Sequence, residues 1–154
     1  MMGQKLKIAL LAAGAAVTLG ACATAEVAAV EAVANTRYAN LTGAQVIGGR
    51  GDPDASAEGF LTISDQLNQI CYDIKNIRNL DGTPTKAVIG RAPRGRTGPT
   101  VMELKWANEG GFKNCTARSE WMEDSLDNRS GAYYIAIYTT AYPNGAIRGN
   151  FYDK

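Results

Sequence analysis

Histidine is absent from the 154 residues of this sequence. Its absence excludes Ser-His-Asp and Cys-His nucleophile systems, a histidine general base, and zinc or copper sites with imidazole ligands. An excess of charge is also lacking, because 16 basic and 15 acidic side chains give a formal charge of +1, which favours no nucleic-acid partner. The length suits one globular domain, and 17 glycines and 7 tyrosines favour turns and strands.

A hydrophobic run long enough to cross a membrane is missing near the start of the chain. The uncharged segment from Ile8 to Leu19 is shorter than the roughly 20 residues that a membrane-spanning helix needs. It follows Lys5 and Lys7, and a positive start before a short apolar stretch is typical of a secretory signal. A buried core helix is the alternative interpretation of this segment.

The residues after this segment, Leu19-Gly20-Ala21-Cys22, resemble a bacterial lipobox. We therefore expect residues 1–21 to be a lipoprotein signal peptide and Cys22 to carry the lipid. Ala23 after the cysteine favours an outer-membrane lipoprotein that faces the periplasm or the cell surface. Ordinary signal cleavage at Ala23-Thr24-Ala25 is the alternative. The Ala-rich residues 22–37 are predicted to be a linker, and residues 38–154 a folded domain.

The remainder of the chain alternates short strand-like runs with turn-forming residues, which predicts an all-β sandwich. In the clearest run, Ile70, Tyr72 and Ile74 alternate with polar neighbours. Residues 107–132 look irregular, with a short helix expected around Trp121 and Met122. The expected strands are Leu41–Ile47, Phe60–Ser64, Leu67–Ile77, Lys86–Gly90, Pro99–Trp106, Tyr133–Thr140 and Ala146–Tyr152, the second with the third and the last two as hairpins.

Cysteine is scarce, and its three positions suggest a single disulfide. Lipidation or removal of Cys22 leaves Cys71 and Cys115, and an even number of cysteines in an oxidising compartment favours a bridge. Because side chains alternate between the two faces of a strand, Cys71 is expected to point away from the apolar face. A surface bridge to Cys115 in the irregular stretch is therefore expected. Two separate buried thiols are the alternative.

Four sets of polar or aromatic residues are considered as candidate sites. Arg91, Arg94 and Arg96 lie in a Gly-rich loop that could bind an anion or could be an ordinary solvated loop. Arg148 is expected to form a structural ion pair with Glu103 or Asp73. The remaining candidates are a carboxylate site for a hard metal ion at Asp52, Asp54 and Glu58, and an aromatic surface or core cluster at Tyr133, Tyr134, Tyr138, Tyr142 and Tyr152.

Four motifs of the folded part are distinctive: Leu41-Thr42-Gly43-Ala44-Gln45, Asp54-Ala55-Ser56-Ala57-Glu58-Gly59, Gly95-Arg96-Thr97-Gly98-Pro99 and Ala141-Tyr142-Pro143-Asn144-Gly145-Ala146-Ile147-Arg148-Gly149-Asn150. Together they resemble the chordin-type (CHRD) domain over most of residues 41–152. The resemblance implies an immunoglobulin-like or superoxide-dismutase-like β-sandwich in an exported bacterial protein. Members commonly carry His-Ile-His where this chain has Val88-Ile89-Gly90, and a histidine where it has Tyr138.

These observations favour a non-catalytic lipoprotein of the cell envelope. Its domain is expected to bind a protein, a glycan or another copy of itself, with no cofactor, no metal and no nucleic acid. The membrane is a partner through the lipid on Cys22. The alternative is a metal-binding or superoxide-dismutase-like enzyme, which the lack of histidine disfavours.

Overall fold

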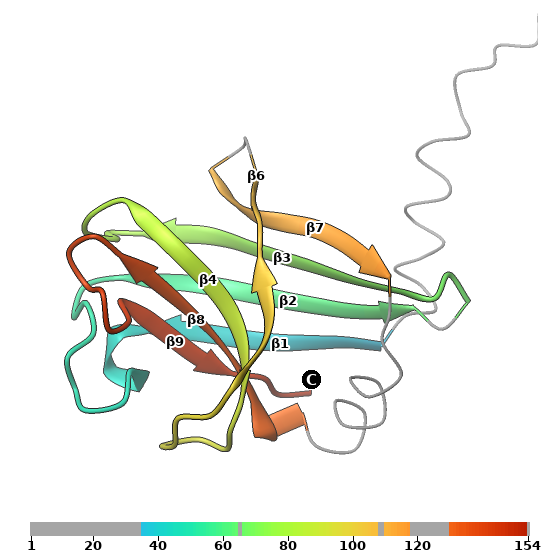
Figure 1. Cartoon of the computed structure of the whole chain (residues 1–154), viewed down its shortest axis with the longest axis horizontal. Coiled ribbons are helices and arrows are strands. Elements are labelled where there is room, and N and C mark those ends of the chain that lie inside the picture. The colour runs from blue at the N-terminus through green and yellow to red at the C-terminus, as the bar shows by residue number, and fades with distance from the viewer. Residues whose placement is uncertain (1–34, 65, 108–109, 118–129, 154) are drawn as a thin grey trace, which may run out of the picture.

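The computed structural model describes residues 35–64, 66–107, 110–117 and 130–153 (Figure 1). This part of the chain is built from β-strands and two short 3₁₀ turns, η1 and η2. None of its segments is a helix long and apolar enough to cross a membrane. The elements are β1 (Asn35–Thr42), η1 (Gly43–Gln45), β2 (Ser56–Ser64), β3 (Gln69–Arg78), β4 (Pro84–Arg91), β5 (Thr100–Leu104), β6 (Trp106–Ala107), β7 (Gly111–Ala117), η2 (Ser130–Ala132), β8 (Tyr133–Thr139) and β9 (Ile147–Asn150).

The strands form one antiparallel sheet in the order β5-β4-β8-β9-β1-β2-β3-β7-β6. The sheet curls so that β4, β8 and β9 lie across β1, β2 and β3 (Figure 1). Its two edge strands, β5 and β6, follow each other in the chain with only Lys105 between them. The backbone N–H of Lys105 donates to the Tyr72 hydroxyl at 2.8 Å, which ties this crossing to β3. The predicted all-β sandwich is confirmed, as a nearly closed sheet.

One hydrophobic core lies between the two halves of the curled sheet. The alternation predicted for β3 is confirmed, since Ile70, Tyr72 and Ile74 are all buried. Ile135 and Ile137 of β8 reach the same core from the other half. Burying these large side chains on both halves contributes roughly 1.5–3 kcal/mol each, and this holds the halves together.

A short seam joins the two halves at β9 and β1. Its ladder consists of the pair Thr42 and Arg148, and an isolated bridge between Tyr38 and Tyr152 lies nearby. The strands approach so closely that a Cβ added to Gly149 would lie 2.4 Å from the carbonyl oxygen of Asn40. Glycine is therefore required at the end of the Ile147-Arg148-Gly149 motif.

The first and fifth expected strands differ from the structure. The first strand is Asn35–Thr42, and not Leu41–Ile47, because the backbone turns after Thr42, with the N–H of Val46 donating to the carbonyl of Gly43. Residues 35–37, which we expected in the linker, pair with β2. The run from Pro99 to Trp106 is split at Lys105, where the chain crosses between the halves. Trp121 and Met122, expected on a helix, lie outside the described residues.

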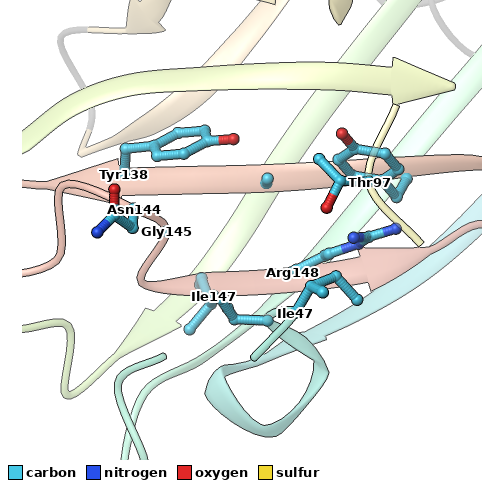
Figure 2. A pocket seen from close by; sticks show the side chains of 10 residues that line it. Ile47, Thr97, Tyr138, Asn144, Gly145, Ile147 and Arg148 are labelled. Carbon is cyan, nitrogen blue, oxygen red and sulfur yellow. The ribbon is translucent and has the colours of Figure 1, made fainter. Parts of the chain in front are cut away.

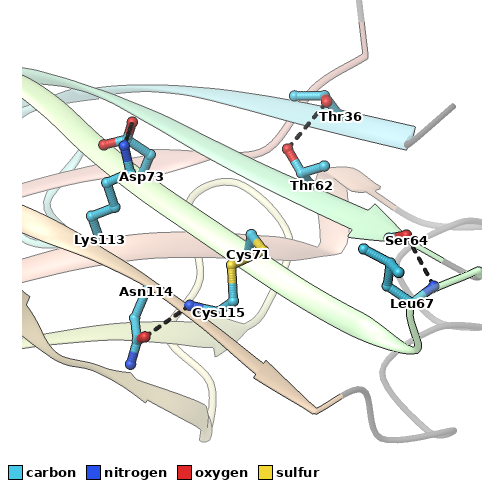
Figure 3. Close-up of a disulfide and its surroundings, with 9 residues drawn as sticks. All are labelled: Thr36, Thr62, Ser64, Leu67, Cys71, Asp73, Lys113, Asn114 and Cys115. Atoms are coloured by element: carbon cyan, nitrogen blue, oxygen red, sulfur yellow. Dashed lines mark hydrogen bonds and ion pairs between the residues drawn. A yellow bond between two sulfur atoms is a disulfide. The ribbon is translucent and has the colours of Figure 1, made fainter. Parts of the chain in front are cut away.

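The predicted disulfide joins Cys71 of β3 to Cys115 of β7 (Figure 3). The two residues are direct partners in the β3–β7 ladder, with their Cα atoms 4.0 Å apart. Cys115 therefore lies on a regular strand, and the expectation that it fastens an irregular stretch was wrong for residues 111–117. The sequence separation of 44 makes the bridge worth about 4 kcal/mol on the chain-entropy model.

Candidate functional site

A second, smaller apolar cluster lies on the face of β4 and β8 that points away from the core. It consists of Val88, Ala92, Tyr134 and Ala136, with Tyr138 packed against it. Strand geometry separates it from the core, because successive side chains of a strand point to opposite faces. This face is not left open to solvent, since Tyr134 is 3% exposed. The loop after β4 covers it, and the Tyr134 hydroxyl donates to the carbonyl of Gly98 at 3.2 Å.

Arg148 of β9 lies on this same covered face. Its residue is 4% exposed, although it carries a positive charge. The guanidinium carbon lies 3.7 Å from the centre of the Tyr134 ring, and Nη2 donates to the carbonyl of Arg96 at 2.6 Å. The ring and the carbonyl are attractive to a cation, but neither carries a full negative charge.

The ion pair expected for Arg148 was wrong. Glu103 pairs with Lys86 at 3.2 Å, and Asp73 pairs with Lys113 at 3.9 Å. Each of these acids forms its ion pair with a lysine on a neighbouring strand, whereas the guanidinium of Arg148 contacts the loop after β4. Within the described part of the chain, Arg148 has no carboxylate partner.

A pocket of about 70 Å³ opens beside Arg148 (Figure 2). We call it the Arg148 pocket. In Figure 2, Arg148 extends from β9 towards Thr97, and the hydroxyl of Tyr138 points along β8 towards the same end. The polar side chains offer hydrogen-bond donors beside an apolar wall. The lining residues are Val46, Ile47, Thr97, Tyr134, Ala136, Tyr138, Asn144, Gly145, Ile147 and Arg148.

Burial shifts the pKa of Arg148 and of Tyr138 in the lining of this pocket. It lowers the pKa of the Arg148 guanidinium, while the phenols of Tyr134 and Tyr138 act in the opposite direction. Burial also raises the pKa of Tyr138 above its usual value of 10.0, with a further rise from Tyr134 and opposing effects of Lys86 and Arg148. At neutral pH the pocket therefore presents a cation and a neutral hydroxyl donor.

A larger and more open pocket of about 540 Å³ adjoins the first one. The two share Val46 and Ile47 in their linings, so they lie next to each other at the chain segment after η1. We call the larger one the broad pocket. It is lined by Ala44, Gln45, Val46, Ile47, Gly48, Gly49, Arg94, Gly95 and Asn150.

The three loop arginines lie in different surroundings. Arg91 ends β4 with its guanidinium 5.9 Å from the Tyr133 ring, and Arg94 lines the broad pocket. Arg96 contributes its carbonyl to Arg148, while its own residue is exposed. A turn closed by the Arg96 N–H on the carbonyl of Pro93 shapes the loop. Anion binding by these three side chains stays a prediction.

The carboxylates considered for a metal ion have structural contacts in the fold. Asp52 is 2% exposed and accepts hydrogen bonds from the backbone N–H groups of Asp54 and Asp81. Glu58 accepts a hydrogen bond from the side-chain amide of Asn76 at 2.9 Å. Over the described ranges, no three His, Cys, Asp or Glu side chains gather closely enough to hold a metal ion.

The tyrosines do not form one flat surface. Tyr133 and Tyr134 are buried on opposite faces of β8, in the core and in the smaller cluster respectively. Tyr138 lies at the Arg148 pocket, and Tyr152 is 37% exposed. The place of Tyr138 at this pocket was not predicted, although its position on the same strand face as Tyr134 and Ala136, by the period of two, is a usable signal.

The fold and this site define a class: an all-β sandwich domain with a small, donor-lined pocket on one covered face. The sequence also identifies the family, which is a narrower assignment than this class. A family model for the CHRD domain matches residues 37–151, so the chain belongs to the CHRD domain family. No curated protein and no solved structure matches the chain significantly.

The positions at which CHRD relatives were expected to carry histidine do not fit a copper or zinc site here. Val88 is apolar, and Tyr138 offers a phenol that stays protonated. Gly90 has no side chain, and a Cβ there would lie 2.2 Å from the Tyr134 ring, which fills the space. The donor set is therefore wrong for these metals, whose usual protein ligands are imidazole, thiolate and carboxylate.

Proposed function

We propose that this protein is a non-catalytic lipoprotein of the cell envelope, anchored by a lipid on Cys22. Its CHRD domain binds a protein or glycan partner through the Arg148 pocket. The lipobox beside an apolar signal segment supports the anchoring. With residues 1–21 removed, residues 22–34 would connect the lipid to β1, which begins at Asn35.

The chemistry of the pocket lining is the observation that carries the binding role. Arg148, Tyr138, Thr97 and Asn144 all offer hydrogen-bond donors, and the other lining residues are aliphatic, aromatic or glycine. The lining includes no carboxylate, thiol, amine or imidazole that could act as a general base or an activated nucleophile. Such a lining supports a role in holding and orienting a ligand group.

Site-directed photo-crosslinking in intact envelopes tests this proposal. A photo-reactive amino acid replaces Ile47 at the pocket rim, which is 41% exposed. Leu67 serves as the matched control, because it is 50% exposed and follows β2 at the opposite end of the strands (Figure 1). We expect an adduct at Ile47 that Leu67 does not give, with a protease-resistant adduct indicating a glycan. Equal labelling at both positions, or none at Ile47, would contradict the proposal.

A further inference from the structure

The positive charge of Arg148 is the feature that points to a particular ligand. A nearly buried guanidinium normally has a carboxylate partner, because an uncompensated charge is costly in a poorly solvated place. Here its contacts are the Tyr134 ring and the Arg96 carbonyl, and burial lowers its pKa. The structure thus retains a cation with unused donors beside a pocket, which is the arrangement expected of an anion site.

The size and shape of the pocket restrict the anion. About 70 Å³ is far less than the roughly 300–1,000 Å³ of sites for drug-sized ligands, so only a small head group enters. The planar fork of a guanidinium matches a carboxylate, and the hydroxyls of Tyr138 and Thr97 are further donors in the lining of the same pocket. Apolar Val46, Ile47 and Ile147 lie beside this polar end. They fit an apolar group attached next to the carboxylate.

The adjoining broad pocket shows where the remainder of the ligand would lie. It shares Val46 and Ile47 with the Arg148 pocket and continues past the exposed backbone of Gly48 and Gly49. An extended chain that leaves the carboxylate site would therefore run along this segment. This segment is a turn in which the N–H of Gly49 donates to the carbonyl of Val46, so the peptide would contact its exposed surface and would not extend a strand.

We propose that the Arg148 pocket binds the C-terminal carboxylate of a peptide whose preceding residues lie in the broad pocket. Arg148 holds the carboxylate, Tyr138 and Thr97 donate to it, and Ile47 contacts the last side chain. This inference rests on the proposed binding function and names the partner chemistry as a protein terminus.

The test is an NMR titration of the ¹⁵N-labelled full chain in detergent. The probe is N-acetyl-Ala-Ala-Val, used as the free acid and as the C-terminal amide, with acetate, inorganic phosphate and glucuronate as further arms. We expect the acid to shift the signals of Ile47, Gly145 and the Arg148 Nε–H, and to bind at least tenfold more tightly than the amide and the three small anions. Equal binding of acid and amide, no binding of the acid, or tighter binding of phosphate or glucuronate would overturn the proposal.

Variants separate binding from folding. Arg148→Lys keeps the charge but loses the fork, and we expect at least a tenfold loss of affinity. Because this change also removes contacts within the fold, Thr97→Val and Tyr138→Phe are the decisive variants. We expect each of them to weaken binding of the peptide acid several-fold and to leave binding of the amide unchanged. The exposed Thr100→Val and Tyr152→Phe are their matched controls and should bind normally. An affinity unchanged in both decisive variants would contradict the assignment.

The peptide titration tests the carboxylate site separately from the broader proposal that the domain binds a partner. If crosslinking at Ile47 captures a partner while the peptide acid fails to bind, the proposed function stands and the carboxylate site is wrong. If both fail, the domain does not use this face.

Discussion

At the scale of the residue, Arg148 and Tyr138 show how a small domain accommodates a charged side chain that is almost buried. Arg148 lies against a ring and a carbonyl, neither of which neutralises it, so its charge opposes folding. Such costs are tolerated where a group has a task other than stability. Tyr138 is half-buried on the same face, and its hydroxyl stays protonated at neutral pH.

Tyr138 makes the stability of the domain depend on pH in the alkaline range. Its pKa is raised in the folded state, so the native protein binds its proton more tightly than the unfolded chain does. This contribution is fully present below about pH 10, the unfolded value, and is lost as the pH rises through the folded value. We expect Tyr138→Phe to lose less stability than the wild type between pH 8 and pH 11, measured by urea unfolding. Tyr152→Phe is the control, and an identical slope in all three proteins would contradict the prediction.

At the scale of the element, the β8–β9 hairpin forms the wall between the core and the Arg148 pocket. Ile135 and Ile137 enter the core, whereas Tyr134, Ala136 and Tyr138 face the pocket side. In β8, a substitution at an odd-numbered position therefore affects the core packing, and one at an even-numbered position affects the pocket.

Ile137→Asp tests the face assignment of β8. Ile137 is fully buried, and an unpaired carboxylate in its place is expected to cost about 3–5 kcal/mol, a large part of the stability of a small domain. Ile47→Asp, at an exposed position, should leave the unfolding free energy nearly unchanged. Circular dichroism during urea unfolding measures both, and a fully stable Ile137→Asp protein would show that the side chain does not face the core.

The Cys71–Cys115 bridge is a second element-scale feature, since it links two strands that are already paired. We expect the double variant Cys71→Ser/Cys115→Ser to lose up to about 4 kcal/mol of unfolding free energy. Reductant should destabilise the wild type by a similar amount and leave the variant unchanged. Two alkylatable thiols in the unreduced, freshly purified protein would show that the bridge does not form.

At the scale of the whole molecule, the lipid anchor proposed on Cys22 would hold the domain at a membrane. Metabolic labelling with a fatty-acid analogue should tag the wild type at Cys22 and should not tag Cys22→Ser. Serine lacks the thiol to which the lipid is attached, so the substitution removes the attachment point. Several acyl chains, at about 0.8 kcal/mol per buried CH₂, would anchor the wild type stably. Equal labelling of both proteins, or a mature N-terminus at Glu26, would refute lipidation.

Much of this molecule could be predicted from sequence because its signals are local. The β2–β3 and β8–β9 hairpins follow from period-two runs and turn residues within a few positions of each other. The order of the sheet could not be predicted, since β1 pairs with β9 and β3 with β7 across long stretches of chain. The Arg148 partner was missed for the same reason, because it is a backbone carbonyl 52 residues away, which no side-chain pattern encodes.

The seam between β1 and β9 has a consequence for how the chain reaches its native state. β1 is the first described strand and β9 the last, yet they are neighbours in the middle of the sheet. Pairings between distant parts of a chain form slowly, because loop-closure entropy must be overcome first. A chain that emerges from a ribosome or a translocation channel N-terminus first can therefore form the β2–β3 hairpin early. It cannot close its sheet until the final residues, through Tyr152, have followed.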